Sequence, residues 1–196
     1  MDNKTNDGVP VNSKFKKFIA DGWDLIKFAV MALVIVIPIR LWIAQPFVVS
    51  GESMHPTFED GQYLIVDELS YITGNAERGD VVIFRYPNDT KRFFIKRVIG
   101  LPNEKIIVKD DSVTIINKEH PDGLKLTEPY LNEKIFGPTG EYTTKDNEYF
   151  VMGDNRNRSS DSRFWGVLPQ KLMIGRAYLR LLPLKEMSYL PGEYKQ

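Results

Sequence analysis

A nearly continuous apolar run, LIKFAVMALVIVIPIRLWIA, constrains this chain more than any other feature. An α-helix needs about 20 such residues to cross the hydrocarbon core of a bilayer. Lys27 and Arg40 lie near the two ends of the run, where long charged side chains can reach the headgroups. Trp23 and Trp42 stand where interfacial aromatic residues are common. The run therefore predicts one transmembrane anchor over residues 25–45.

Two other interpretations of the run compete with an anchor. A cleavable signal peptide would have a shorter apolar region that ends in a small-x-small site, which residues 42–45 (WIAQ) do not offer. A buried core helix is seldom apolar on every face. The lysines of the preceding polar tail, residues 1–24, favour a cytoplasmic N-terminus. We therefore predict a single-pass protein of the cell membrane whose extracytoplasmic domain spans residues 46–184, followed by a C-terminal tail of residues 185–196.

Composition excludes several classes of function. Lys plus Arg and Asp plus Glu balance at 26 each, so nothing indicates a nucleic-acid partner. The absence of Cys excludes disulfides, a thiolate nucleophile and thiolate metal ligands. His55 and His120 are the only histidines, too few for most histidine metal sites. We therefore expect neither a metal nor another cofactor.

Beyond the apolar run, the pattern changes from helical to extended. Short β-prone runs are separated by Gly, Pro, Asn or Asp, as in an antiparallel sandwich or barrel. Residues 110–112 (DDS) are typical of a hairpin turn and residues 170–174 of one helical turn, whereas residues 117–148 predict a long loop. The residues after Pro183 are expected to have no role in the chemistry. The fold class is thus mainly β, an antiparallel β-sheet domain behind one N-terminal transmembrane helix. Its β-prone runs are Tyr63–Val66, Val81–Phe84, Phe93–Ile99, Ile106–Val108, Val113–Ile116, Tyr149–Val151 and Ala177–Leu182.

Ser53 lies in a segment that can present it as a nucleophile. This segment, residues 47–57, runs from β-type apolar residues into the serine and then into Pro56. A serine hydroxyl is a poor nucleophile and needs a base within hydrogen-bond distance. His55 would share a face with Ser53 on a strand, but Pro56 disturbs that geometry. His120 lies in a polar, loop-like segment, so a histidine base is the weaker hypothesis.

Lys96 is the better candidate for the base. In residues 92–100, a period of two puts Lys96 on one face with Phe94 and Val98. If this face is buried, desolvation disfavours the ammonium and lowers the pKa of the lysine. A neutral amine can then accept the serine proton, as in Ser-Lys variants of the catalytic triad. The alternative is a strand lysine whose charged end reaches solvent.

The stretch from Gly153 to Arg163 is dense with hydrogen-bonding side chains. It could be a solvated loop or a calcium-binding loop, although it lacks the ligand spacing and closing Glu of an EF-hand. The functional interpretation is a polar shell that orients Lys96, with Asp161 and Arg163 as an internal ion pair.

Together these segments resemble type I signal peptidases, the bacterial leader peptidases, which are membrane-anchored serine proteases that remove signal peptides from exported proteins. The resemblance runs from the anchor to about Leu182 and, with one anchor, is greatest to the Gram-positive form. The similar segments occur in the order expected for the family. They are the nucleophile motif GESMHPT at 51–57, RGDVV at 78–82, the lysine segment FIKRVIGLP at 94–102, EPYL at 128–131 and the polar stretch at 153–163.

The resemblance implies roles for individual residues. Ser53 matches the family's nucleophile, Lys96 its general base and Ser159 a serine that hydrogen-bonds the lysine. Asp161 and Arg163 match a pair that holds the site together. It also implies a mainly antiparallel β core, no metal, and preprotein signal peptides bound as an added strand, with small residues at the first and third positions before the cut. The candidates for substrate binding are Met54, Phe58, Phe94 and Ile95.

The sequence departs from the family pattern at two places. Some members have a serine two residues before the nucleophile that helps to stabilise the oxyanion, but Gly51 stands here, and on a strand Ser50 would point elsewhere. The oxyanion hole would then depend on backbone N–H groups, chiefly that of Ser53. Asn103-Glu104 replaces the more usual Gly-Asp and alters a turn. Two other functions stay open: a membrane-tethered β-domain that binds partners without catalysis, and a Ser-Lys enzyme that cleaves itself.

Overall fold

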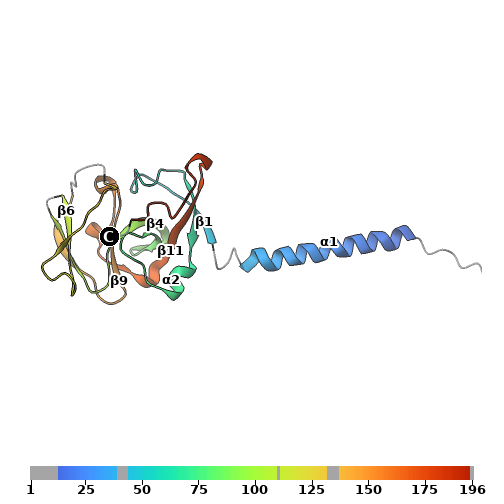
Figure 1. The fold of residues 1–196 in the computed structure, drawn as a ribbon, viewed down its shortest axis with the longest axis horizontal. Coiled ribbons are helices and arrows are strands. Elements are labelled where there is room, and N and C mark those ends of the chain that lie inside the picture. Colours follow the sequence, from blue (N-terminus) through green and yellow to red (C-terminus); the bar gives the residue numbers. More distant parts are fainter. Residues whose placement is uncertain (1–12, 39–43, 110, 132–136, 195–196) are drawn as a thin grey trace, which may run out of the picture. The chain divides into compact units, whose positions relative to one another are not determined.

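A computed structural model of the chain describes residues 13–38, 44–109, 111–131 and 137–194. The chain divides into two compact units, Met1–Leu41 and Trp42–Gln196. In the first unit, helix α1 (Ser13–Pro38) begins well before the apolar run and ends at a proline inside it (Figure 1).

The predicted anchor is not confirmed. Among the residues that the structure describes, no helix combines the length and the apolar character of a membrane span. Within residues 25–45, residues 39–43 lie outside the described part of the chain, and Ala44 already begins the first strand.

The second unit is mainly antiparallel β, as predicted. In the described part of the chain, eight strands form one sheet in the order β1-β2-β11-β3-β4-β9-β10, with β12 on β11, and four form another in the order β7-β6-β5-β8. Figure 1 shows the smaller sheet, around β6, at one end of this unit, and β1, β4 and β11 of the larger sheet toward the other. The strands are β1 (Ala44–Val48), β2 (Tyr63–Asp67), β3 (Val81–Tyr86), β4 (Asp89–Gly100), β5 (Lys105–Lys109), β6 (Ser112–Ile116), β7 (Leu124–Lys125), β8 (Gly140–Thr143), β9 (Glu148–Met152), β10 (Leu168–Pro169), β11 (Met173–Leu182) and β12 (Ser188–Tyr189).

All seven predicted β-prone runs are strands, namely β2, β3, β4, β5, β6, β9 and β11. The predicted hairpin turn joins β5 to β6, with Asp111 at φ 61°, and the predicted helical turn is the 3-10 helix η3 (Gln170–Leu172). The long loop predicted for residues 117–148 contains the short strands β7 and β8. These strands have only two and four residues, and an alternation of apolar and polar residues cannot be recognised over so short a length.

The residues after Pro183 are folded onto the larger sheet. A 3-10 helix, η4 (Leu184–Glu186), leads into β12, which pairs with β11. The N–H of Leu190 donates to the carbonyl of Tyr178 at 2.8 Å, and Pro191 is buried. The described C-terminal residues therefore belong to the folded unit, whereas the sequence predicted a separate tail.

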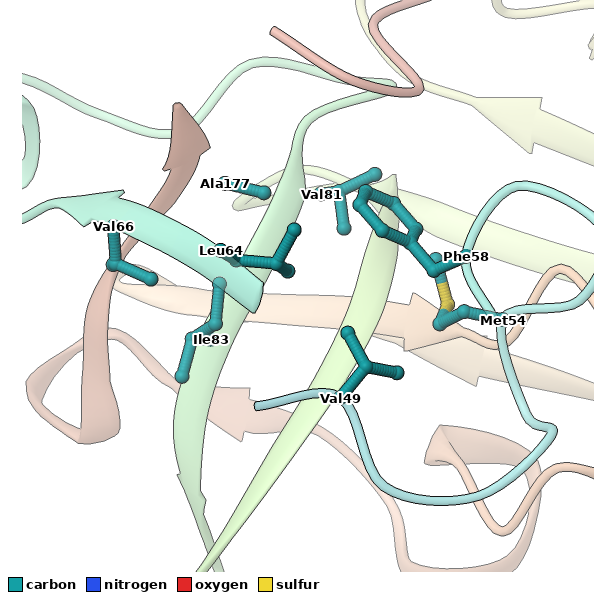
Figure 2. Packing of buried hydrophobic residues seen from close by; sticks show 8 residues of the cluster. All are labelled: Val49, Met54, Phe58, Leu64, Val66, Val81, Ile83 and Ala177. Carbon is teal, nitrogen blue, oxygen red and sulfur yellow. The ribbon is translucent and has the colours of Figure 1, made fainter. Parts of the chain in front are cut away.

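One core cluster lies beneath the loop that joins β1 to β2. Met54 and Phe58 of this loop are fully buried, and Figure 2 shows them turned toward the strands, with the Phe58 ring beside Val81. Burying a large apolar side chain contributes about 1.5–3 kcal/mol, so these two residues fix the loop on the sheet. The cluster consists of Val49, Met54, Phe58, Leu64, Val66, Val81, Ile83 and Ala177.

Candidate active site

Ser53 lies in the loop between β1 and β2, in a series of turns. Gly51, at φ 88°, adopts a left-handed conformation that suits glycine, and its N–H donates to a carboxylate oxygen of Asp60 at 2.7 Å. The carbonyl of Ser53 accepts a hydrogen bond from the N–H of Asn155 at 3.0 Å. The loop is thereby tied to the polar stretch that follows β9, and the backbone of Ser53 is held from two sides.

Lys96 lies in the middle of β4, opposite Val82 of β3, and is only 4 % exposed. Its Nζ lies 2.8 Å from Ser53 Oγ and 2.8 Å from the carbonyl oxygen of Ile95. The alternative of a lysine that reaches solvent is therefore wrong. The two candidate catalytic side chains, which are far apart in the sequence, are in direct hydrogen-bond contact.

Burial dominates the electrostatics of Lys96. Desolvation lowers its pKa from 10.5 to about 8, and the negative charges of Asp161 and Asp154 oppose part of this effect. About one amine in ten is therefore neutral at pH 7, and a neutral amine can accept the Ser53 proton. Both histidines, by contrast, are exposed.

Asp161 and Arg163 form the predicted internal ion pair. Arg163 Nε lies 2.8 Å from Asp161 Oδ1, Nη2 lies 2.9 Å from Oδ2, and both side chains are fully buried. Asp161 also accepts the N–H of Gly153 at 3.1 Å and caps the short helix α3 (Ser162–Trp165). Arg163 Nη2 also donates a hydrogen bond to the carbonyl of Arg156 at 2.6 Å. The ion pair thus fixes the fold of residues 153–163, and Asn155 of this stretch binds the carbonyl of Ser53.

Ser159 is buried close to the nucleophile, but the predicted hydrogen bond with Lys96 is not present. Its Oγ has no hydrogen-bond partner among the residues that the structure describes. A Cβ atom added at Gly153 would overlap both Ser159 Oγ and the carbonyl oxygen of Ser53. Only a glycine at position 153 allows these groups to pack so closely.

A second buried ion pair, between Arg97 and Asp154, was not predicted as part of the site. Arg97 Nε lies 2.8 Å from Asp154 Oδ1, Nη2 lies 2.5 Å from Oδ2, and the two side chains are at most 1 % exposed. Thr57 Oγ1 donates to Asp154 Oδ2 at 2.5 Å, so the same carboxylate also holds the Ser53 loop. The period of two in β4 puts Arg97 on the face opposite Lys96, but no signal in the sequence identifies Asp154 as its partner.

A cavity of about 430 Å³ opens beside Ser53 and Lys96. Its walls come from residues 47–50 at the end of β1 and from residues 92–95 of β4. Two predicted substrate-binding residues, Phe94 and Ile95, are among these wall residues. In the described part of the chain, β1 is an edge strand, and β4 pairs with β9 only from Arg97 onward, so both walls offer unpaired strand edge.

The other two predicted substrate-binding residues, Met54 and Phe58, do not line this cavity. Both point into the core, because their apolar side chains gain more from burial there than at the surface. Ser50 was predicted to point away from the nucleophile, yet it lines the cavity together with Ser53. That prediction assumed a strand, and the turns after β1 break its period of two. No group of three or more His, Asp or Glu side chains that could hold a metal ion occurs among the described residues.

Comparisons with known proteins identify one family and several similar proteins. The family described as signal peptidase, peptidase S26, matches residues 22–182. The chain is 35 % identical over 176 residues to a probable signal peptidase I-2 of Synechocystis sp., covering 87 % of this chain and 78 % of that protein. It is 35 % identical over 177 residues to a signal peptidase I of Bacillus licheniformis, covering 84 % and 91 %. A solved signal peptidase I from Enterococcus faecalis V583 is similar at 31 % identity and a TM-score of 0.45, covering 52 % of this chain and 96 % of that chain.

Proposed function

We propose that this chain, which belongs to the signal peptidase family, peptidase S26, removes N-terminal signal peptides from exported preproteins with a Ser53–Lys96 dyad. The observation that carries this proposal is the 2.8 Å contact between Ser53 Oγ and the Nζ of a lysine that is 4 % exposed. A surface lysine at the same distance would stay protonated and would not serve as a base.

In the proposed reaction, neutral Lys96 takes the proton of Ser53 while Oγ attacks the scissile carbonyl carbon. The oxygen of the tetrahedral intermediate carries the negative charge, and the backbone N–H of Ser53 is the proposed donor to it. The Lys96 ammonium then gives its proton to the leaving amine, the C–N bond breaks, and an acyl-enzyme remains on Ser53.

Hydrolysis of the acyl-enzyme repeats these steps with water. Lys96, again neutral, takes a proton from a water molecule, which attacks the ester carbonyl. The C–Oγ bond breaks, the proton returns from Lys96 to Ser53, and the signal peptide, which was the acyl group, leaves with a free carboxylate. Asp161, Arg163 and Ser159 are proposed to support the dyad without touching the reacting atoms.

The substrate is proposed to bind as an extended segment beside the unpaired edges of β1 and β4. Main-chain hydrogen bonds to an exposed strand edge give such a complex affinity, and side-chain pockets give it specificity. Phe94 and Ile95 line the cavity near the dyad, and we propose that their side chains restrict the size of the substrate residues that fit there. A preference for small residues at the first and third positions before the cut follows.

Residues 25–45 are proposed to anchor the protein in the cell membrane, with the N-terminus in the cytoplasm. The support is the apolar run itself, its flanking charges and the exposure of apolar side chains of α1 between Trp23 and Val36. An anchor would hold the active site where signal peptides leave the bilayer, and so raise the effective substrate concentration without new contacts.

A preprotein with an Ala-x-Ala site, incubated with the full-length protein in detergent micelles, tests this proposal. Substrates with Ala, Leu or Lys at the first or third position before the cut should be cleaved only when both positions are Ala. Equal cleavage of all substrates would contradict the specificity, and binding without cleavage would favour a non-catalytic domain. The mass of the enzyme after prolonged incubation should be unchanged, because self-cleavage is a competing function.

A further inference from the structure

The last described residues pack against Arg97 and against the loop that carries Ser53. We define residues 190–194 as the C-terminal strap. It leaves β12 at Leu190, whose N–H is bound to the carbonyl of Tyr178, and a turn follows in which the N–H of Glu193 donates to the carbonyl of Leu190 at 3.1 Å. Pro191 between them is buried, so the strap has a defined path on the domain.

The strap contacts Arg97 directly. The carbonyl of Gly192 accepts a hydrogen bond from Arg97 Nη1 at 2.5 Å. At Gly79, which precedes β3, an added Cβ would overlap the carbonyl oxygen of Tyr194. The ring of Tyr194 also packs edge-on against Tyr130 at 5.9 Å between centroids. The strap is therefore held by contacts before and after Gly192, at Leu190 and at Tyr194.

The strap also contacts the loop that carries Ser53. Gly192 has φ 78°, and a Cβ there would lie 2.5 Å from Thr57 Cγ2 and 3.3 Å from Phe58 Cε2. These distances leave no room for a side chain between the strap and the loop. A bulkier residue at 192 would have to push Thr57 away.

Gly192 is connected to each residue of the dyad through Arg97 and the contacts that Arg97 makes. Arg97 is the neighbour of Lys96 on β4, and its remaining guanidinium nitrogens bind Asp154. Asp154 in turn accepts the hydroxyl of Thr57, four residues after Ser53 in the same loop. The strap thus contacts both the strand that positions the base and the loop that positions the nucleophile.

We propose that the C-terminal strap is a positioning element for the Ser53–Lys96 dyad, an inference that rests on the proposed function. It presses the loop toward β4 and so maintains the 2.8 Å contact between Oγ and Nζ. A displacement of about 1 Å in a reacting group can cost on the order of 100-fold in rate. Loss of the strap should therefore reduce kcat, whereas KM should change little, because the strand edges that are proposed to bind the substrate belong to β1 and β4.

The substitution Gly192→Ala tests the proposal, and Gly61→Ala is its matched control. Gly61 has a similar φ of 81°, but an added Cβ there meets nothing within 4 Å. Both variants therefore have the same backbone strain, and only Gly192→Ala pushes against the loop. A second variant ends the chain after Tyr189 and removes the strap entirely. All are assayed in micelles with the Ala-x-Ala preprotein, and kcat is expressed per folded molecule from near-ultraviolet circular dichroism.

We expect Gly192→Ala and the truncated chain to lower kcat per folded molecule by about 10- to 100-fold, with KM within about threefold of the wild-type value. Gly61→Ala should retain the wild-type kcat. A kcat per folded molecule equal to wild type in both strap variants, or unfolding of both at the assay temperature, would show that the strap serves stability alone and would overturn the proposal. Failure of the wild type to cleave would instead refute the proposed function on which the strap's role depends.

Discussion

The rate of cleavage should follow the deprotonation of Lys96 as the pH is raised. A lysine with its ordinary pKa of 10.5 would be neutral in only about 0.03 % of molecules at pH 7. Burial lowers the pKa to about 8, so that about 10 % are neutral at the same pH, a gain of about 300-fold in the active form. The neutral form is the base, so kcat/KM should rise about tenfold per pH unit below pH 7 and level off above about pH 9.

The assay measures kcat/KM between pH 5.5 and 10 with an Ala-x-Ala preprotein that carries no titratable side chain near the cut. His55→Asn is the control, because the exposed His55 is the alternative base nearest to Ser53 in the sequence. The control should have the wild-type profile. A flat profile, or a pH dependence that disappears in His55→Asn, would refute the assignment of Lys96 as the base.

Three further changes have outcomes that the structure specifies. Lys96→Met should raise the free energy of unfolding at pH 7 by up to about 3 kcal/mol, as measured by urea denaturation, because burial lowers the pKa of Lys96 to about 8 in the folded protein whereas the unfolded lysine keeps its proton. The difference in stability between the variant and the wild type should disappear as the pH rises from about 8 to above 10.5. Asp154→Asn should cost about 3–5 kcal/mol by the same measurement, because it leaves a buried guanidinium unpaired, whereas Glu52→Gln, in an exposed ion pair, should cost less than about 1 kcal/mol. Gly153→Ala should lower kcat by about 10-fold or more, because the new methyl group overlaps the carbonyl oxygen of Ser53. Gly166→Ala is the control and should keep the wild-type kcat, because Gly166 has φ 92° and an added Cβ there meets nothing within 4 Å; equal kcat values for the two variants would contradict the close packing at Gly153.

The sequence predicted the base because a period of two puts Lys96 on one face of β4 with Phe94 and Val98, and an apolar face on a central strand is expected to be buried. The structure buries Lys96 and Val98, but it buries the opposite face of this half of β4 as well. The contact between Lys96 and Ser53 came from comparing motifs, since no local pattern specifies which of two distant segments meet. The Asp161–Arg163 pair was predictable because its partners are two residues apart and fold around one helix start.

Other features depend on tertiary packing that no local pattern encodes. Met54 and Phe58 lie in an irregular loop, where neither a period of two nor one of 3.6 indicates which side chains point inward. The contact of Gly192 with Arg97 joins residues that are far apart in the chain, and the C-terminal sequence has no apolar run that would indicate folding onto the sheet. Ser159 shows the limit of a role taken from a resemblance, because its position is near the nucleophile but its hydrogen bond is absent.

Cleavage of preproteins by Ser53 and Lys96 acting together can be tested directly. Wild type, Ser53→Ala and Lys96→Met are incubated side by side in micelles with an Ala-x-Ala preprotein, and the new N-terminus of the product is sequenced. We expect a cut directly after the second Ala of the site by wild type alone, with the rates of both variants reduced by at least about 1,000-fold. Cleavage by Lys96→Met at the wild-type rate would contradict the Ser-Lys mechanism, and cleavage by Ser53→Ala would contradict the assignment of the nucleophile.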